Sequence, residues 1–204
     1  MMATPGAHTP RPTLAQRRKA QTRLEIARTA ARLFAEHGTA AVTAERIAGE
    51  SGVGLRTFYR YCRTKEDAVE PLLSMGASRW LDRLAAGPAR LPTTAELEAA
   101  AARAMTPEDD GHELEITRGL LRAMREDPAL RAVWHRVNLN GEQALLDVLT
   151  ERAPEADSLR RRLTAAAAAG AIRVALEEWA DDDTAGSPTP LVVRSMRELT
   201  AGIS

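Results

Sequence analysis

Apolar residues recur along this chain at intervals of three and four, the spacing that places side chains on one face of an α-helix. The stripe is clearest near the two ends, at Ile26, Ala30, Leu33 and Phe34 and at Val192, Met196, Leu199 and Ile203. Alternation of β-branched with polar residues, which is typical of strands, is missing, and alanine is abundant. The pattern predicts an all-α protein of about nine helices.

Capping residues and helix breakers indicate where these helices begin and end. Thr93 and Glu96 form a capping box, and Gly38 ends the first long helix. Proline follows a capping residue at Thr106, Asp127 and Ser187. The predicted helices cover residues 14–37, 44–50, 55–61, 64–86, 94–105, 108–126, 128–152, 157–181 and 189–202.

Residues 42–65, VTAERIAGESGVGLRTFYRYCRTK, are typical of two short helices joined by a glycine turn. Thr43 is a natural N-cap for the first helix, and Gly52 accepts the left-handed geometry of a C-cap. The second helix is crowded with residues that bind nucleic acid: Arg56, Thr57, Tyr59, Arg60 and Tyr61. A helix-turn-helix places this second helix in the major groove of DNA.

The same segment resembles the TetR-type bacterial repressors, whose pattern it matches without a gap. The matching residues are Thr43, Ile47, Ala48, Gly52, Val53, Thr57, Phe58, Tyr59, Tyr61, Lys65 and Glu66. Gly54 departs from a serine N-cap that is frequent in the family, and Cys62 replaces a common phenylalanine. The resemblance implies a helix-turn-helix DNA-binding domain at residues 14–64 and a ligand-binding and dimerisation domain at 65–204.

The resemblance also implies which side chains contact DNA. Base and backbone contacts are expected from Leu55, Arg56, Thr57, Tyr59 and Tyr61, and phosphate contacts from Thr43 and Lys65. Charge and helix face add Arg46 and Arg60. Tyr59 and Tyr61 are two residues apart and cannot share one helix face, so one of them is expected to pack partly inward. Phe58 is expected to point into the core.

Charged residues are unevenly distributed, although the chain holds 28 basic and 28 acidic residues. Residues 1–65 hold 12 basic and 4 acidic residues, a net charge of +8, and the remainder carries −8. A basic amino-terminal third is typical of a DNA-binding module, and an acidic remainder favours a separate sensing and pairing domain. The basic start of the first helix would either contact DNA or form a solvated helix end.

Several other classes of function are disfavoured. A single cysteine, Cys62, excludes an intrachain disulfide and suits the cytoplasm; it is either a small buried residue or a redox-sensitive thiol.

No apolar stretch approaches the roughly 18 residues of a membrane span, and residues 1–13 are expected to form a disordered arm. The histidines lack metal-ligand spacing, and no phosphate-binding glycine loop or nucleophile elbow occurs. We therefore expect no metal, no cofactor, no membrane partner and no enzymatic activity.

Residues 157–181 and 189–202 are candidates for a pairing surface. The first contains the run LTAAAAAGAI at 163–172, whose small side chains let another helix approach closely. From the residues alone, these two helices would equally well close a monomer core or form a four-helix bundle between two copies. The resemblance implies the bundle, and therefore a homodimer that binds two half-sites of a near-palindromic DNA operator.

A small-molecule cavity is also expected, although the same residues would serve as ordinary core. Its candidate lining residues are Trp80, Met105, His112, Leu121, Met124, Trp134, Asn138, Arg173 and Trp179. Arg173 needs a partner, either an anionic ligand or a structural glutamate such as Glu177. The segments 120–134 and 171–180 resemble the mycofactocin-type branch of the family, which implies an apolar, anionic, acyl-CoA-like effector.

The sequence therefore predicts a dimeric, sequence-specific transcriptional regulator, a repressor that a small ligand releases from a palindromic operator. The alternative is a DNA-organising protein that binds without a ligand. Clear base preference and a pocket would favour the regulator, whereas weak preference and no pocket would favour the alternative.

Overall fold

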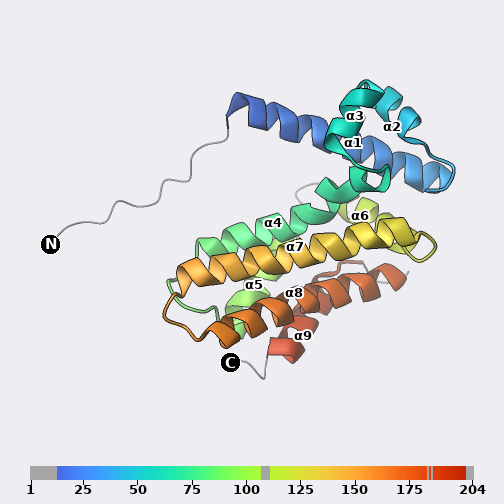
Figure 1. The fold of residues 1–204 in the computed structure, drawn as a ribbon. Coiled ribbons are helices and arrows are strands. Elements are labelled where there is room, and N and C mark those ends of the chain that lie inside the picture. Colours follow the sequence, from blue (N-terminus) through green and yellow to red (C-terminus); the bar gives the residue numbers. More distant parts are fainter. Residues whose placement is uncertain (1–12, 107–110, 183, 185, 201–204) are drawn as a thin grey trace.

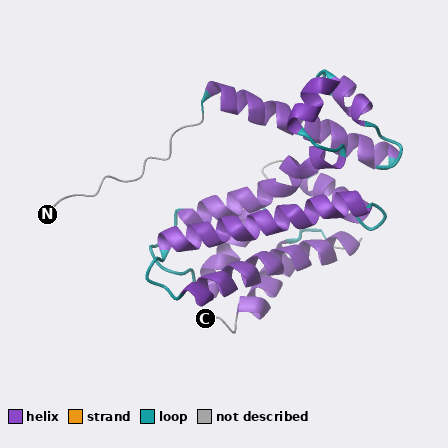
Figure 2. Cartoon of the chain, viewed as in Figure 1, coloured by secondary structure: helices purple, strands orange, loops and turns teal. Residues whose placement is uncertain are grey.

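The computed structural model describes residues 13–106, 111–182, 184 and 186–200. Within these residues every regular element is helical and no strand occurs, as Figure 2 shows, so the predicted all-α class is confirmed. The elements are α1 (Leu14–His37), α2 (Ala44–Glu50), α3 (Leu55–Tyr61), the 3-10 helix η1 (Glu66–Val69), α4 (Glu70–Ala85), α5 (Thr94–Ala104), α6 (His112–Ala123), α7 (Pro128–Arg152), α8 (Ser158–Asp181) and α9 (Thr189–Thr200).

Helices α1, α2 and α3 form a small body at one end of the molecule, from which α4 leads into the layered larger part (Figure 1). Its core joins all three helices, since Ile26 and Leu33 of α1, Ile47 of α2 and Phe58 of α3 are all fully buried. Burial of such large apolar side chains is the main stabilising contribution to so small a body. Phe58 thereby fixes which face of α3 points outward.

The turn between α2 and α3 follows from local capping. The Thr43 hydroxyl accepts a hydrogen bond from the backbone N–H of Arg46 at 3.2 Å, as an N-cap does. Gly52 takes the left-handed conformation, with a φ of 69°, and lets the chain reverse. Gly54 precedes α3 without a side-chain cap, as its lack of a hydroxyl requires.

Two predicted helices differ from the observed ones. The predicted helix 64–86 begins as η1, and its α-helical part starts only at Glu70. Pro71 explains the delay, because a proline ring clashes with the carbonyl four residues earlier and is tolerated in the first turn. The predicted helix 108–126 is observed as His112–Ala123, preceded by Gly111 with a φ of 86°. The cap at Thr106-Pro107 and the acidic residues 108–110 lie at or beyond the edge of the described residues.

In the larger part, α9 packs against α5 and α8, and α7 packs against α4 and α8. The alanine run of α8 faces this interior, since Ala165, Ala168, Ala171 and Ala175 are at most 1% exposed. Small side chains therefore serve close packing within one chain. In the described part of the chain no helix combines the length and apolar character that crossing a bilayer requires.

Candidate nucleic-acid interface and small-molecule cavity

The outer face of α3 carries Leu55, Arg56, Tyr59 and Arg60. These positions share one side of the helix, opposite the buried Phe58, because residues four apart lie one above the other. Half of the Tyr59 surface is exposed, at 51%, and both arginines are exposed. The face thus presents two guanidinium groups and a phenol hydroxyl to a partner.

Thr57 and Tyr61 lie at the flanks of that face and are half-buried. The guanidinium of Arg60 lies 5.1 Å from the centre of the Tyr61 ring, a cation–π contact that restrains the arginine. Tyr59 instead contacts the buried Phe58 edge-on, with ring centres 5.4 Å apart. The structure therefore places Tyr59 outward and Tyr61 partly in the core.

Arg46, at the start of α2, is held in a surface network. Its Nε donates to Glu50 at 2.9 Å, and its Nη2 lies 2.8 Å from Nε2 of His37. Arg32 donates to the same Glu50 carboxylate at 2.5 Å. Hydrogen bonds from Arg32 and then Arg46 lower the pKa of Glu50 below its usual value. A phosphate contact by Arg46 would have to share its guanidinium with Glu50.

Lys65 has a structural contact that sequence reasoning missed. Its Nζ donates to the backbone carbonyls of Thr39 at 2.6 Å and Val42 at 2.8 Å. These carbonyls belong to the turn between α1 and α2, so the ammonium fixes the position of α2 relative to η1. The same Nζ lies 3.8 Å from a carboxylate oxygen of Glu66. Contact of Lys65 with a phosphate remains a prediction.

Asp67, in η1, is a buried carboxylate at the junction between the small body and the larger part. It is 8% exposed and accepts a hydrogen bond from Nε of Arg63, just after α3, at 3.2 Å. Arg136 of α7 donates to the other oxygen of the same carboxylate and lies 3.4 Å from Glu70. One side chain therefore connects the end of the outward-facing helix to α7.

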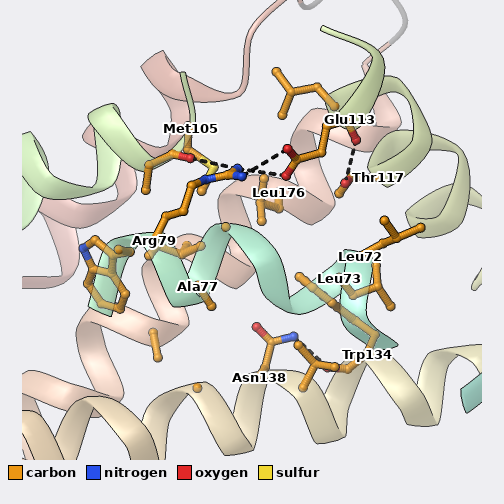
Figure 3. Close-up of a pocket in the computed structure, with 18 residues that line it drawn as sticks. Leu72, Leu73, Ala77, Arg79, Met105, Glu113, Thr117, Trp134, Asn138 and Leu176 are labelled. Atoms are coloured by element: carbon orange, nitrogen blue, oxygen red, sulfur yellow. Dashed lines mark hydrogen bonds and ion pairs between the residues drawn. The ribbon is translucent and has the colours of Figure 1, made fainter. Parts of the chain in front are cut away.

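An apolar cavity of about 70 Å³ lies between α4, α5, α6, α7 and α8 (Figure 3). Its polar lining includes an ion pair between Arg79 of α4 and Glu113 of α6, whose atoms lie 2.8 and 3.1 Å apart. Asn138 of α7 extends toward α4, and its amide nitrogen donates to the Trp134 carbonyl at 2.8 Å.

Four of the predicted ligand-binding residues line this cavity: Trp80, Met105, Trp134 and Asn138. The two charged lining residues, Arg79 and Glu113, were not among those predicted from the sequence. They lie 34 positions apart, so no local spacing could have paired them. The sequence gives one indication of Arg79, which is that this charged residue directly precedes the candidate lining residue Trp80.

The other predicted ligand-binding residues lie elsewhere. Arg173 pairs with Glu177 at 2.9 Å, the structural partner considered above, and Glu177 also accepts from the Trp134 indole at 2.8 Å. Trp179 is fully buried beneath the guanidinium of Arg118, 4.2 Å away, and donates to a backbone carbonyl.

Leu121 and Met124 line a different hollow beside Trp134. His112 is exposed at the start of α6.

Cys62 is a buried free thiol that follows α3 directly. Burial raises the pKa of the Cys62 thiol to about 11, although Arg23 acts to lower it. This favours the small buried residue over the redox-sensitive thiol. No group of three or more metal-ligating side chains is found among the residues that the structure describes.

Helix α8 has an exposed apolar stripe beside its buried alanine face. Leu159, Leu163 and Val174 are 62%, 48% and 46% exposed, and their spacing of four and eleven residues keeps them on one side. Leu199 of α9 is also exposed. Exposed apolar side chains that share one side of a helix make it a candidate interaction surface.

Two family models match the chain. Residues 26–70 match the model described as bacterial regulatory proteins, tetR family, and residues 92–204 match the model of the MftR C-terminal domain. The second match alone spans more than half of the chain. A comparison with curated proteins finds no match.

Solved structures with this fold include FadR from Bacillus subtilis in complex with stearoyl-CoA, at 21% identity and a TM-score of 0.56, covering 89% of this chain and 99% of that one. A tetR-family regulator from Streptomyces coelicolor is 19% identical with a TM-score of 0.51, covering 89% and 79%. The multidrug binding protein EbrR complexed with imidazole is 20% identical with a TM-score of 0.50, covering 87% and 93%. At these identities the likeness shows the fold alone.

Proposed function

Because the chain belongs to the TetR family of bacterial regulatory proteins, we propose that it is a homodimeric repressor that a small molecule releases from a near-palindromic DNA operator. Its family makes it a transcriptional regulator with a helix-turn-helix DNA-binding domain and an MftR-type C-terminal domain. The observation that carries the proposal is the outer face of α3, where Arg56, Tyr59 and Arg60 are exposed opposite the buried Phe58.

In the proposed complex, α3 enters the major groove. Arg56 is the base reader, because a guanidinium donates two hydrogen bonds to guanine, and Leu55 and Thr57 contact neighbouring base edges. Tyr59 and Arg60 donate to phosphates at the groove edges, and Tyr61 supports Arg60 from its flank.

Phosphates also approach the starts of two helices. At Thr43 the first N–H groups of α2 point outward, which favours an anion. Arg46 adds positive charge there, and Lys65 adds it beside η1. Lys65 contributes mainly through its charge and through the turn that it holds, since two of its hydrogens are engaged with Thr39 and Val42.

The dimer is proposed to form through α8 and α9. The exposed stripe of Leu159, Leu163 and Val174 would be covered by its own copy across a two-fold axis, and Leu199 lies on the neighbouring helix. Removing these side chains from water stabilises the pair by roughly 25 cal/mol for each Å² of apolar surface buried. A two-fold pair presents two copies of α3 to two half-sites.

The effector is proposed to be an apolar anion of the acyl-CoA kind. The MftR-type C-terminal domain, the apolar lining of the cavity and the presence of Arg79 in it support this class. FadR, which shares the fold, was solved with stearoyl-CoA. A volume of about 70 Å³ is far below the roughly 300–1,000 Å³ of ordinary ligand pockets. An acyl chain can therefore enter only if the surrounding helices separate.

Such a separation would reach the DNA-binding helices through η1. Helix α4 continues directly from η1, and Asp67 of η1 joins Arg63 after α3 to Arg136 of α7. The effector would favour a conformation in which the two α3 helices are spaced poorly for DNA. A hundredfold loss of operator affinity requires about 2.7 kcal/mol of coupling between the sites.

The deciding experiment selects bound duplexes from a random DNA pool at near-physiological salt, with wild type and Arg56→Ala side by side. We expect a near-palindromic motif from wild type and the loss of base preference at one position of each half-site in Arg56→Ala. The affinity cost is about 1–3 kcal/mol per half-site.

The selected sequences also test the alternative function. Binding without an enriched motif, and lost as salt rises, would contradict the repressor and point to ligand-independent DNA organisation. An unchanged motif in Arg56→Ala would show that another residue reads the bases.

A further inference from the structure

A second, larger cavity is lined by the last turn of α4, one face of α5 and the last turns of α7. In Figure 1 these ends of α4 and α7 lie away from α2 and α3. Its volume is about 350 Å³, within the range of ordinary small-molecule sites. Four arginines line it, Arg83, Arg90, Arg103 and Arg152, together with one acidic residue, Glu96. Among the described lining residues the formal net charge is therefore +3.

Most of this charge is uncompensated within the described chain. Arg90 pairs with Glu96 through two contacts of 2.7 and 2.8 Å. Arg83, Arg103 and Arg152 form no ion pair with any described residue. The Nε of Arg152 is also buried with no hydrogen-bond partner in the described structure. A buried N–H without an acceptor is destabilising, so the chain itself leaves this guanidinium incompletely satisfied.

Helix electrostatics explain part of the arrangement. Arg83, Arg103 and Arg152 each lie in the last turn of a helix, where a cation complements the negative end of the helix dipole. That effect acts at each helix end separately. It does not account for three such ends meeting at one hollow, where the like charges repel one another.

The remaining walls of the cavity are apolar. They are formed by Leu84, Pro88, Pro92, Ala100, Val148 and Leu149. Arg83, Arg90 and Arg103 are exposed and Arg152 is partly buried, so a ligand would meet partly solvated guanidinium groups beside these walls. The walls also provide contact surface for the uncharged part of a ligand.

We propose that this arginine cavity binds a phosphate-bearing small molecule, a diphosphate that is either free or part of a nucleotide. The planar fork of a guanidinium matches phosphate oxygens two at a time, and a diphosphate carries enough negative charge to balance the lining. The site does not depend on the proposed operator binding. A ligand bound there would nevertheless contact α4, α5 and α7, which also line the apolar cavity. On α4, for example, Leu84 of the arginine cavity lies one turn after Trp80 of the apolar cavity.

The test is calorimetric titration of the intact protein with inorganic pyrophosphate and with ADP, at about 150 mM salt to screen weak surface binding. We expect saturable binding of one ligand per chain, weakened about tenfold in Arg103→Gln and in Arg152→Gln, which each remove one charge-assisted contact. Tighter binding of ADP than of pyrophosphate would assign the site to a nucleotide, and equal affinities to the diphosphate alone.

Two further variants make the result specific. Arg131→Gln, at the opposite end of α7, should bind like wild type. Glu96→Gln should bind more tightly, because it removes the one lining carboxylate and leaves Arg90 available, while a glutamine still completes the capping box with Thr93. Each variant is checked for folding by its helical circular dichroism.

The proposal is overturned if neither pyrophosphate nor ADP binds saturably, or if Arg103→Gln and Arg152→Gln retain wild-type affinity while folded. Operator binding is measured separately on the same samples. Failure of the DNA experiment with intact pyrophosphate binding would therefore remove the proposed repressor function and leave the arginine cavity standing.

Discussion

Arg79 on α4 and Glu113 on α6 form a two-pronged ion pair, with nitrogen–oxygen distances of 2.8 and 3.1 Å, at the wall of the apolar cavity (Figure 3). The same guanidinium donates to the carbonyl of Ala104 at 3.3 Å, so one side chain joins α4, α5 and α6. The two side chains are 22% and 16% exposed, which makes their attraction stronger than that of an ordinary surface pair. An anionic effector in this cavity would compete with Glu113 for Arg79.

Glu113→Gln is therefore expected to strengthen the binding of an acyl-CoA. The variant removes the competing carboxylate while keeping the shape of the side chain, and we expect roughly fivefold tighter binding of decanoyl-CoA in calorimetric titration. Glu115→Gln, an exposed residue of the same helix, is the control and should bind like wild type. Equal gains in both variants would indicate a general effect of charge on α6, and no gain would remove Arg79 from the effector site.

Lys65→Met is expected to destabilise the protein even without DNA. Two backbone carbonyls, those of Thr39 and Val42, would lose a charged donor. The expected loss is about 1–3 kcal/mol in the free energy of unfolding, measured by urea denaturation. Lys19→Met, on an exposed part of α1, should change it little. Unchanged stability in Lys65→Met would return Lys65 to a role in DNA contact alone.

Leu163→Arg is expected to separate the proposed dimer. The substitution places a charge in the centre of the exposed stripe on α8, where a second copy would have to bury it. Sedimentation velocity at micromolar protein should show monomers for this variant and dimers for wild type. Leu139→Arg is the matched control, because Leu139 is 66% exposed on α7, outside α8 and α9. A dimeric Leu163→Arg would mean that the subunits pair elsewhere.

Cys62 is expected to react slowly in the folded protein. Burial raises the pKa of its thiol to about 11, so hardly any thiolate is present at pH 8, and labelling by a disulfide reagent should accelerate on unfolding in urea. The pKa of the Cys62 thiol in the folded protein lies above its reference value of 9.0. The contribution of this thiol to the free energy of unfolding is therefore fully present below pH 9.0 and is lost as the pH rises toward 11. Fast labelling of folded protein at pH 8 would restore the redox interpretation.

The limits of α1, α2, α3 and α7 follow from short-range signals. The Thr43 cap and the left-handed Gly52 act on their own neighbours, and the observed bounds agree with the predicted ones. At α4 the local reasoning was incomplete. The sequence predicts a helix that starts at residue 64, but Pro71 clashes with the carbonyl of Asp67 and residues Glu66–Val69 form a 3-10 helix.

Side-chain partners far apart in sequence could not be predicted in the same way. Arg79 meets Glu113 and Asp67 meets Arg136 only because helices from different parts of the chain pack together. Trp179 shows a different limit, because an aromatic residue on a helix face suits a cavity wall and a sealed core equally well. The structure buries Trp179 completely.

The sequence by itself determined the helical class, most helix limits, the family and the outer face of α3, because capping, periodicity and a gap-free motif act over a few residues. The tertiary structure decided which candidate residues surround a cavity, that Lys65 holds a turn, and that three helix ends bring Arg83, Arg103 and Arg152 to one hollow. The physical reason is that cavities and ion pairs depend on the packing of distant helices, and one helix's periodicity does not specify its neighbour.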